Sequence, residues 1–349
     1  MFRYAFKRVA RSYRLFIALT IGVLLATSFF AATNVAADVI SRDALNASVE
    51  GYIYDFAVES SSSNWSTSDI QDLESTILAS DDGITASTHS TQLKFEYNNT
   101  GLNMTLAGIE MSSPLTTGMQ LISGRSSLGP NETYIVLGSA NESLFALDQV
   151  VEVEVVVKGF PFPSIIRRNF TVAGLVSFPE DTRDAILQAP AFNLFDLFTG
   201  GGVGGGAFAF FGASTYNLMI TDWDLSISSI LQEASEISNH ISVGLRNLIH
   251  VQIDRQRVLD PYDIDASLAR LNGIESVISV PVSAYNGDII SNLRSPLTIY
   301  QFTSIFMNLQ FISLSLPVFL LAYFSGTMVS DVGYNFRRRE IGLLLTKGY

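Results

Sequence analysis

The sequence contains no cysteine, and only 15% of its 349 residues are charged. Without cysteine the chain can form neither disulfides nor thiolate metal sites, so a domain outside the cytoplasm must be stable through its core alone. So few charges, together with a mean hydropathy of +0.29, predict membrane-spanning segments. The 33 acidic residues outnumber the 21 basic ones, which argues against nucleic acid as a partner.

Motifs of catalysis and nucleotide binding are also scarce. The three histidines show no His-x-x-x-His spacing, and the chain has no Gly-x-Ser-x-Gly elbow and no Gly-Lys-Ser or Gly-Lys-Thr. Gly200, Gly202 and Gly205 match a dinucleotide fingerprint only formally, because no clear strand precedes them, and the run Gly200 to Gly206 is interpreted as a loop tip. We therefore expect no enzyme, no metal and no cofactor bound by this chain.

Acidic residues are dense at two places, and a metal site is the alternative interpretation there. Asp222 and Asp224 form one group, and Asp260, Asp263 and Asp265 form the other. Dense carboxylates usually form a solvated face, so we interpret both groups in that way.

Two long segments lack charge altogether. Leu15 to Ala37 would reach about 34 Å as a helix, enough to cross a hydrocarbon core of about 30 Å, and a second span is expected at 299–329 within the charge-free stretch Ser295 to Ser330. A cleaved signal peptide is the alternative for the first span, since Val35 and Ala37 are small.

The distribution of charge predicts the orientation. Nine of the 21 basic residues lie in the short ends: Arg3, Lys7, Arg8, Arg11, Arg14, Arg337, Arg338, Arg339 and Lys347. By the positive-inside rule, the basic N-terminal helix 1–14 and segment 330–349 face the cytoplasm, while 38–298, with 31 acidic and 12 basic residues, lies outside. We expect a multi-pass protein of the plasma membrane.

Acceptor sequences for N-linked glycans are more frequent than composition predicts. With 18 Asn and 63 Ser plus Thr, about three would arise by chance. Seven occur, all in the segment expected outside: Asn46, Asn64, Asn98, Asn103, Asn131, Asn141 and Asn169. The excess favours an archaeal or eukaryotic surface glycoprotein, and accidental matches in a chain rich in Ser and Thr are the alternative.

The external segment predicts an α+β fold, a large mixed α/β domain with a β-rich part at about 121–215, carried between two transmembrane helices. The expected strands are 44–60, 134–138, 150–157, 169–177, 216–221, 248–258 and 274–280, with a hairpin at 93–109 that turns at Asn98 to Gly101. The expected helices are 66–80 with Ser68 as N-cap, 225–245, and one that starts at Pro261 and stops at Asn272 and Gly273. In 150–157, Val151, Val153 and Val155 should be buried opposite Glu152 and Glu154.

The C-terminal end combines a basic cluster with a short amphipathic helix. Its apolar stripe of Ile341, Leu344, Leu345 and Gly348 suits docking into a groove on a cytoplasmic partner, and a snorkelling membrane anchor is the alternative. This segment resembles the coupling segment of the FtsX/MacB family of ABC-transporter permeases. The matching residues are Arg338, Arg339, Glu340, Ile341, Gly342, Leu345, Gly348 and Tyr349, with Tyr349 where a small residue is more usual.

The external segment resembles the MacB-type core domain as well. The match comprises Gly124-Arg125, Ile135 to Gly138, Leu147, Val150 to Val157 and Phe170 to Leu175, in the family's order. Permeases of this family have at least four spans, so the chain resembles the front part of one, either a fragment or a chain that needs a separately encoded second half.

The resemblance implies a permease subunit of a mechanotransmitting ABC system. It implies a separate cytoplasmic ATPase that binds the ATP and docks on the coupling segment, and a second permease copy or the remaining transmembrane half as further partner. Export, release of a substrate, or activation of an outside enzyme would be the result. A membrane-anchored receptor or adhesion domain without an ATPase is the alternative.

Overall fold

A computed structural model describes residues 13–60, 65–97, 102–137, 144–157, 163–187, 217–237 and 244–346. The chain divides into two units, one comprising Met1–Asn46 with Tyr300–Tyr349 and the other comprising Ala47–Ile299. Most of the expected N-terminal helix 1–14, the turn at 98–101 and the glycine run at 200–206 lie outside the described residues.

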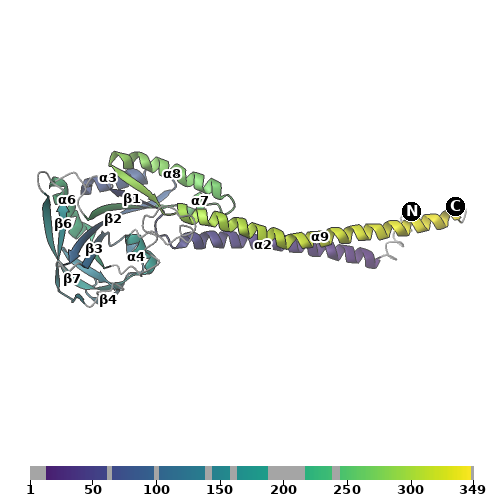
Figure 1. Ribbon diagram of the computed structural model, residues 1–349, viewed down its shortest axis with the longest axis horizontal. Coiled ribbons are helices and arrows are strands. Elements are labelled where there is room, and N and C mark those ends of the chain that lie inside the picture. The colour runs from purple at the N-terminus through teal and green to yellow at the C-terminus, as the bar shows by residue number, and fades with distance from the viewer. Residues whose placement is uncertain are drawn as a thin grey trace. The chain divides into compact units, whose positions relative to one another are not determined.

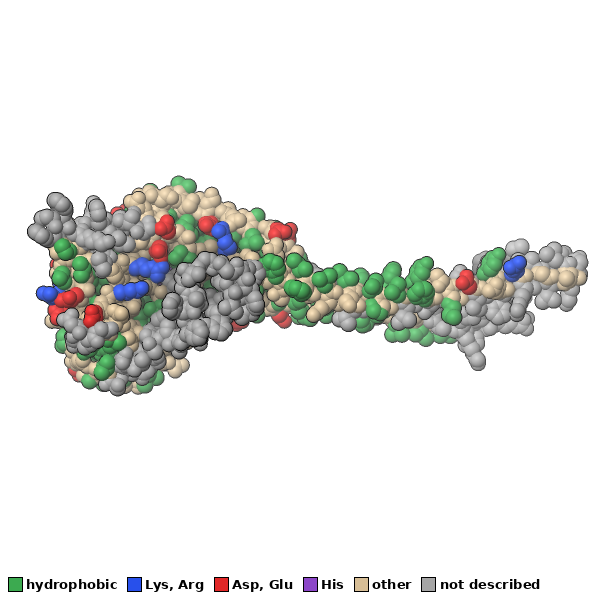
Figure 2. Space-filling model, in the orientation of Figure 1, with side chains coloured by type: hydrophobic (Ala, Val, Ile, Leu, Met, Phe, Trp, Pro, Cys, Tyr) green, Lys and Arg blue, Asp and Glu red, His purple; other side chains and the backbone are tan. Residues whose placement is uncertain are grey.

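The first unit is helical. It contains most of α2 (Tyr13–Glu50) and most of α9 (Arg294–Thr346). Apolar side chains along both helices are exposed, among them Leu25, Phe30, Phe319 and Met328 (Figure 2). By length and composition, two helices of the described chain are able to cross a membrane: Thr20–Glu50 and Arg294–Met328. The tyrosine hydroxyl of Tyr300 donates to the carbonyl of Ser41 (2.9 Å), which joins the two helices within this unit.

The second unit is built on one mixed sheet of ten strands (Figure 1). The strand order is β10-β1-β9-β2-β3-β8-β5-β7-β4, with β6 also paired to β7. Only β3/β8 and β5/β7 are parallel pairs among these. The strands are β1 (Phe56–Ser60), β2 (Ile84–Tyr97), β3 (Leu102–Ile109), β4 (Gln120–Gly124), β5 (Glu132–Val136), β6 (Val150–Val157), β7 (Ser164–Ser177), β8 (Leu218–Asp222), β9 (Leu245–Ile253) and β10 (Gly287–Ser291). The mixed α/β fold class is therefore confirmed.

Helices cover both faces of the sheet. On one face lie α3 (Thr67–Leu78), α6 (Ser228–Ile237) after the π-helical turn η3 (Trp223–Ile227), and α8 (Ile264–Ala284); the short α7 (Arg255–Val258) follows β9. On the other lie the 3₁₀ helix η1 (Pro114–Thr116) and α4 (Glu180–Leu187). Successive side chains of β2 point to opposite faces of the sheet. His89 contacts Glu74 of α3 on one face, whereas Gln92 donates to the carbonyl of Ile186 of α4 on the other.

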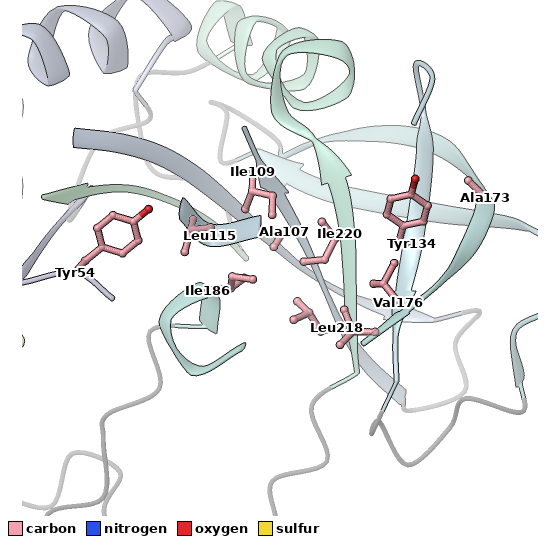
Figure 3. Packing of buried hydrophobic residues seen from close by; sticks show 11 residues of the cluster. Tyr54, Ala107, Ile109, Leu115, Tyr134, Ala173, Val176, Ile186, Leu218 and Ile220 are labelled. Atoms are coloured by element: carbon pink, nitrogen blue, oxygen red, sulfur yellow. The ribbon is translucent and has the colours of Figure 1, made fainter. Parts of the chain in front are cut away.

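The α4 face encloses an apolar cluster drawn from distant parts of the sequence (Figure 3). Its members are Tyr54, Ala107, Ile109, Leu115, Tyr134, Val136, Ala173, Val176, Ile186, Leu218 and Ile220. Four of the ten strands and both small helices contribute. Burial of this apolar surface is the main favourable term that holds η1 and α4 on the sheet.

Several sequence expectations are confirmed. The hairpin forms, with β2 and β3 antiparallel from Ser90↔Ile109 to Tyr97↔Leu102. In β6 the valines 151, 153 and 155 are buried, while Glu152 and Glu154 are exposed. Helix α3 lies within the expected range 66–80, but its N-cap is Ser66, which forms a capping box with Asp69, rather than Ser68.

The strand expected at 44–60 is wrong for most of its length. Residues 44 to 50 continue α2, and only Phe56–Ser60 form a strand. The alternation of small and polar residues in this stretch fits a helix as well as a strand, and Gly51 then ends the helix.

Corrections are also needed near the end of the domain. The strand expected at 274–280 is part of α8, because Leu271, Ile274, Ile278 and Val282 follow a helical spacing and are buried, so Asn272 and Gly273 do not stop the helix. Strand β10 was not expected. The helix expected at 225–245 ends at Ile237 in the described chain, and residues 255–258 form α7 instead of a strand.

Candidate functional site

The chain enters and leaves the sheet unit on adjacent strands. The incoming strand β1 pairs antiparallel with the outgoing strand β10, from Phe56↔Ser291 to Ser60↔Gly287. Just before this ladder, the backbone N–H of Asn292 donates to the carbonyl of Asp55 (2.9 Å). The end of α2 and the start of α9 therefore reach the sheet at one place, which we call the junction (residues 49–55, 252–255 and 292–294).

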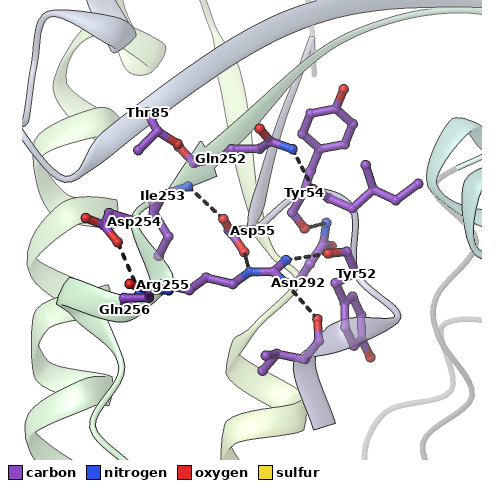
Figure 4. Close-up of polar contacts among 12 residues, drawn as sticks. Tyr52, Tyr54, Asp55, Thr85, Gln252, Ile253, Asp254, Arg255, Gln256 and Asn292 are labelled. Carbon is purple, nitrogen blue, oxygen red and sulfur yellow. Dashed lines mark hydrogen bonds and ion pairs between the residues drawn. The ribbon is translucent and has the colours of Figure 1, made fainter. Parts of the chain in front are cut away.

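Arg255 holds the end of α2 at this junction (Figure 4). Its guanidinium donates to the carbonyl of Val49 (2.9 Å) and to the carbonyl of Tyr52. The last carbonyls of a helix have no partner within the helix, and a cation near them also interacts favourably with the helix dipole. Since the last turn of α2 has no basic residue of its own, Arg255 supplies this interaction from α7.

Asp55 anchors the guanidinium from the other side. Its carboxylate accepts from the Arg255 Nε (2.7 Å) and from the backbone N–H of Ile253 (2.7 Å), and the residue is 1% exposed. Burial raises the pKa of the Asp55 carboxyl, and the charge of Arg255 opposes that increase. The ion pair thus joins a buried carboxylate to a half-buried guanidinium, and it connects the residue before β1 to the residues after β9.

Further polar contacts tie the same segment to the sheet. The Asn292 amide donates to the carbonyl of Tyr54 (3.2 Å), and the Gln252 amide donates to the carbonyl of Ile53 (3.0 Å). At the start of α9, Arg294 contacts Glu275 (2.8 Å) and Asn272 (2.7 Å) of α8. Both helix ends are therefore bound to the sheet unit by side chains from different elements.

Sequence reasoning missed the junction entirely. Asp55 lay in an expected strand and Arg255 in another, and no motif links residues 200 positions apart in the sequence. Only the pairing of β9 beside β1 brings them together. The one signal available was a charged residue, Asp55 or Arg255, inside an expected strand, because a charge that is buried in a sheet requires a partner of opposite charge.

The expected ATPase-coupling segment continues α9 as a helix through Thr346. No break separates it from the expected second span. The coupling residues Arg338, Arg339, Glu340, Ile341, Gly342, Leu344 and Leu345 lie in this helix, and Gly348 lies outside the described residues. Arg338 and Gly342 are exposed.

The Gly124-Arg125 motif has a structural role in the fold. Gly124 has a φ of +106°, and a Cβ atom at this position would lie 2.3 Å from the carbonyl oxygen of Ala173. Arg125 follows with ion pairs to Glu132 and Asp148. The glycine permits close approach of β4 to β7, and the arginine joins the end of β4 to the start of β5 and to Asp148 before β6.

The carboxylate clusters serve as helix caps and turns. Asp222 accepts from the N–H of Leu225 (2.9 Å), and Asp263 accepts from the N–H of Ala266 (2.8 Å). Asp260 accepts from the N–H of Tyr262 (2.9 Å). Among the described residues, no group of three His, Asp or Glu side chains is placed to hold a metal ion.

Four of the glycan-acceptor asparagines are in the described part of the chain. Asn46, Asn103, Asn131 and Asn169 are all exposed. Asn64, Asn98 and Asn141 lie outside the described residues.

Comparisons with known proteins give only weak likeness to solved structures. No family model matches the sequence, and no curated protein matches it. Among solved structures, the chain is similar to the extracellular domain of the noncanonical ABC-type transporter YknZ from Gram-positive bacteria, at 12% identity and a TM-score of 0.27, covering 58% of this chain and 78% of that one. At this level the likeness carries no functional conclusion.

Proposed function

We propose that this chain is a permease subunit, or the N-terminal part of one, of an FtsX/MacB-like ABC transporter. In this proposal a separate cytoplasmic ATPase binds and hydrolyses ATP. Its movement displaces the coupling segment, and the two helices carry the displacement to the sheet unit outside. Export of a substrate, its release, or activation of an outside enzyme is the result.

The sequence supports the orientation and the partner. Basic residues gather at both ends of the chain, and acidic residues gather between the two apolar segments. The segment from Arg338 to Gly348 resembles the family's coupling segment. The exposed apolar side chains of α2 and α9 are what helices facing lipid require.

The observation that carries the proposal is the junction. A displacement of a helix reaches a domain only if the connection between them does not absorb it. Here only residues 51–55 connect α2 to β1, and the carbonyls of Val49, Ile53 and Tyr54 are held by side chains of the sheet unit, namely Arg255, Gln252 and Asn292.

Helices are suited to this task because their hydrogen bonds run along the axis and lipid offers no competing partners. A push on α9 would reach α8 through Arg294, and the residue before β1 through Asn292. A push on α2 would reach β9 through the ion pair of Asp55 and Arg255. Both routes end in the sheet unit, where β1 pairs with β10 on one side and with β9 on the other, so this unit would respond as one body.

Binding of the ATPase tests the proposal directly. Membranes that contain the full chain are incubated with ABC ATPases from the source cell, and the ATPase retained is measured by pull-down. Glu340→Ala and Ile341→Ala should each reduce the retained ATPase at least tenfold. Thr346→Ala, a change at an exposed position outside the matching residues, is the control and should bind as the unaltered chain does.

Two results would contradict the proposal. One is retention that is unchanged in the double variant of Glu340 and Ile341. The other is no retention of any ABC ATPase by the unaltered chain, which would favour the membrane-anchored receptor or adhesion domain. In each case the fluorescence of the two tryptophans, Trp65 and Trp223, reports whether the sheet unit is folded, because both are buried in it.

A further inference from the structure

Three asparagines of the sheet unit combine an acceptor sequence with an exposed side chain. Asn103 in β3 is followed by Met-Thr, Asn131 before β5 by Glu-Thr, and Asn169 in β7 by Phe-Thr. They lie on three different strands or strand ends, and the carbonyl of Asn131 accepts from the N–H of Thr171 in the acceptor sequence of Asn169 (2.9 Å). All three belong to the segment that carries the excess of acceptor sequences.

We propose that Asn103, Asn131 and Asn169 carry N-linked oligosaccharides. The proposal shares with the proposed function only the placement of the sheet unit outside the cytoplasm. It does not require an ATPase, a coupling segment or a transported substrate. The ligand class is a saccharide chain supplied by a lipid-linked saccharide phosphate. The anomeric carbon bonds to the side-chain amide nitrogen, its bond to the phosphate oxygen breaks, the lipid-linked phosphate leaves, and the nitrogen loses one proton.

The folded structure can accommodate a saccharide on each of these side-chain amides. The carbonyl of Asn103 accepts from Asn217 (3.1 Å), and the N–H of Asn131 donates to the hydroxyl of Ser226 (2.9 Å). Both contacts use backbone atoms of Asn103 and Asn131 and leave their side chains unused. Within the described residues, the side chains of Asn103, Asn131 and Asn169 make no hydrogen bond, so a saccharide would displace none.

The buried Asn247 shows the contrast. Its side-chain oxygen accepts from the Thr91 hydroxyl (2.9 Å) inside the sheet, and the residue is fully buried. It is followed by Leu-Ile and is not an acceptor. Asparagine therefore occurs in two settings in this domain, as a buried residue hydrogen-bonded through its side-chain oxygen and as an exposed acceptor.

The folded structure also indicates when attachment must occur. The residue after Asn103, Met104, is 1% exposed, and the residue after Asn169, Phe170, is fully buried. Thr133, in the acceptor sequence of Asn131, is fully buried and donates its hydroxyl to Ile220 (2.9 Å). A transferase must hold the whole three-residue segment, so these sites become inaccessible once the strands pair. Attachment must precede folding.

Mass spectrometry of the full chain, purified from the membranes of its own cells, tests the proposal. The peptides with Asn103, Asn131 and Asn169 should each carry a saccharide mass in most molecules. Asn103→Gln, Asn131→Gln and Asn169→Gln should each remove one saccharide mass from the intact protein.

Matched variants show whether modification requires the whole acceptor sequence or only the asparagine. Thr105→Ala and Thr171→Ala leave Asn103 and Asn169 in place and should abolish their modification, whereas Thr105→Ser and Thr171→Ser should retain it. Recovery of the three peptides unmodified, or modification that persists in both alanine variants, would overturn the proposal. Modification of at least two of the three sites, lost in the alanine variants, supports it.

The timing is tested with protein made in cells that lack the transferase. Folded full chain mixed with membranes of the source cell should gain no saccharide at these sites, while chain translated in the presence of those membranes should gain it. Equal modification of folded and newly translated chain would overturn the inference on timing. ATPase retention measured on the same samples shows whether the proposed function stands or fails separately.

Discussion

The ring of Tyr54 lies against the imidazole of His250, with 4.7 Å between the ring centroids and 32° between the planes. Tyr54 belongs to the junction, and His250 is a fully buried residue in the middle of β9. The His250 Nε2 shares a hydrogen bond with the Ser90 hydroxyl of β2 (2.8 Å). Through this contact the segment after α2 is packed on the central strands.

Acid should weaken the sheet unit through His250. Burial, together with the charge of Arg246, lowers the pKa of His250 to about 3 from its ordinary value of 6.5. Below pH 6.5 the unfolded chain takes up a proton that the folded chain refuses, so stability falls as the pH falls from 6.5 towards 3. Between pH 7.5 and pH 5 the loss should be about 2 kcal/mol, measured by urea unfolding followed by tryptophan fluorescence.

The matched variant is His250→Asn, which cannot titrate. It should be less stable than the unaltered chain at pH 7.5, because it leaves a gap against Tyr54, and its stability should change less between pH 7.5 and pH 5. An equal pH dependence in both proteins would show that other groups cause the loss.

Removal of Arg255 should be strongly destabilising. Arg255→Met leaves the buried Asp55 carboxylate without its ion-pair partner and leaves the carbonyls of Val49 and Tyr52 without a donor. The free energy of unfolding should fall by about 3 to 5 kcal/mol, measured by urea unfolding of the full chain in detergent.

Asp55→Asn combined with Arg255→Met should recover part of this loss, because no charge then remains buried. Arg257→Ala changes an exposed arginine of the same helix and should cost less than about 0.5 kcal/mol. A loss from Arg257→Ala as large as that from Arg255→Met would contradict the role assigned to the ion pair.

Gly124→Ala should destabilise the sheet unit through the backbone. The positive φ of Gly124 is unfavourable for alanine, and the added Cβ would collide with Ala173 and Gly174. We expect a loss of about 1 to 3 kcal/mol or more in the free energy of unfolding. Gly129→Ala is the control, since its nearest neighbour to a Cβ is a Glu132 side-chain oxygen at 3.4 Å, and it should be nearly neutral.

A flexible insertion at the junction should uncouple the sheet unit from the helices. Three glycines inserted after Gly51 separate Val49 from Tyr52, so Arg255 can no longer hold both carbonyls. ATPase retention should be unchanged, because the insertion is far from the coupling segment in the sequence. Ile122→Cys provides a single site for a fluorescent label, since the native chain has no cysteine and residue 122 is exposed. In the chain with the insertion, this label should lose its response to ATP.

The same insertion in the turn between β2 and β3 is the control. It leaves the junction intact, so the label should still respond to ATP. A full response from the chain with the junction insertion would contradict the transmission that we propose.

Local patterns predicted the elements whose burial is periodic within themselves. The alternation in β6, the hairpin of β2 and β3, and the apolar stripe of α3 each rest on neighbouring residues, and all three form. The same reasoning failed at α8, where Asn272 and Gly273 suggested a stop but packing of Leu271 and Ile274 against the sheet outweighs the cost of one glycine.

By itself the sequence determined the mixed fold class, the two apolar segments and the division into a charged middle and basic ends, because each depends on composition or on spacing along the chain. Tertiary structure alone decided that β1 lies between β10 and β9, and therefore that Asp55 meets Arg255 and Tyr54 meets His250. Strand pairing selects partners by the total apolar surface that the sheet buries, and that sum has no signature in any short stretch of residues.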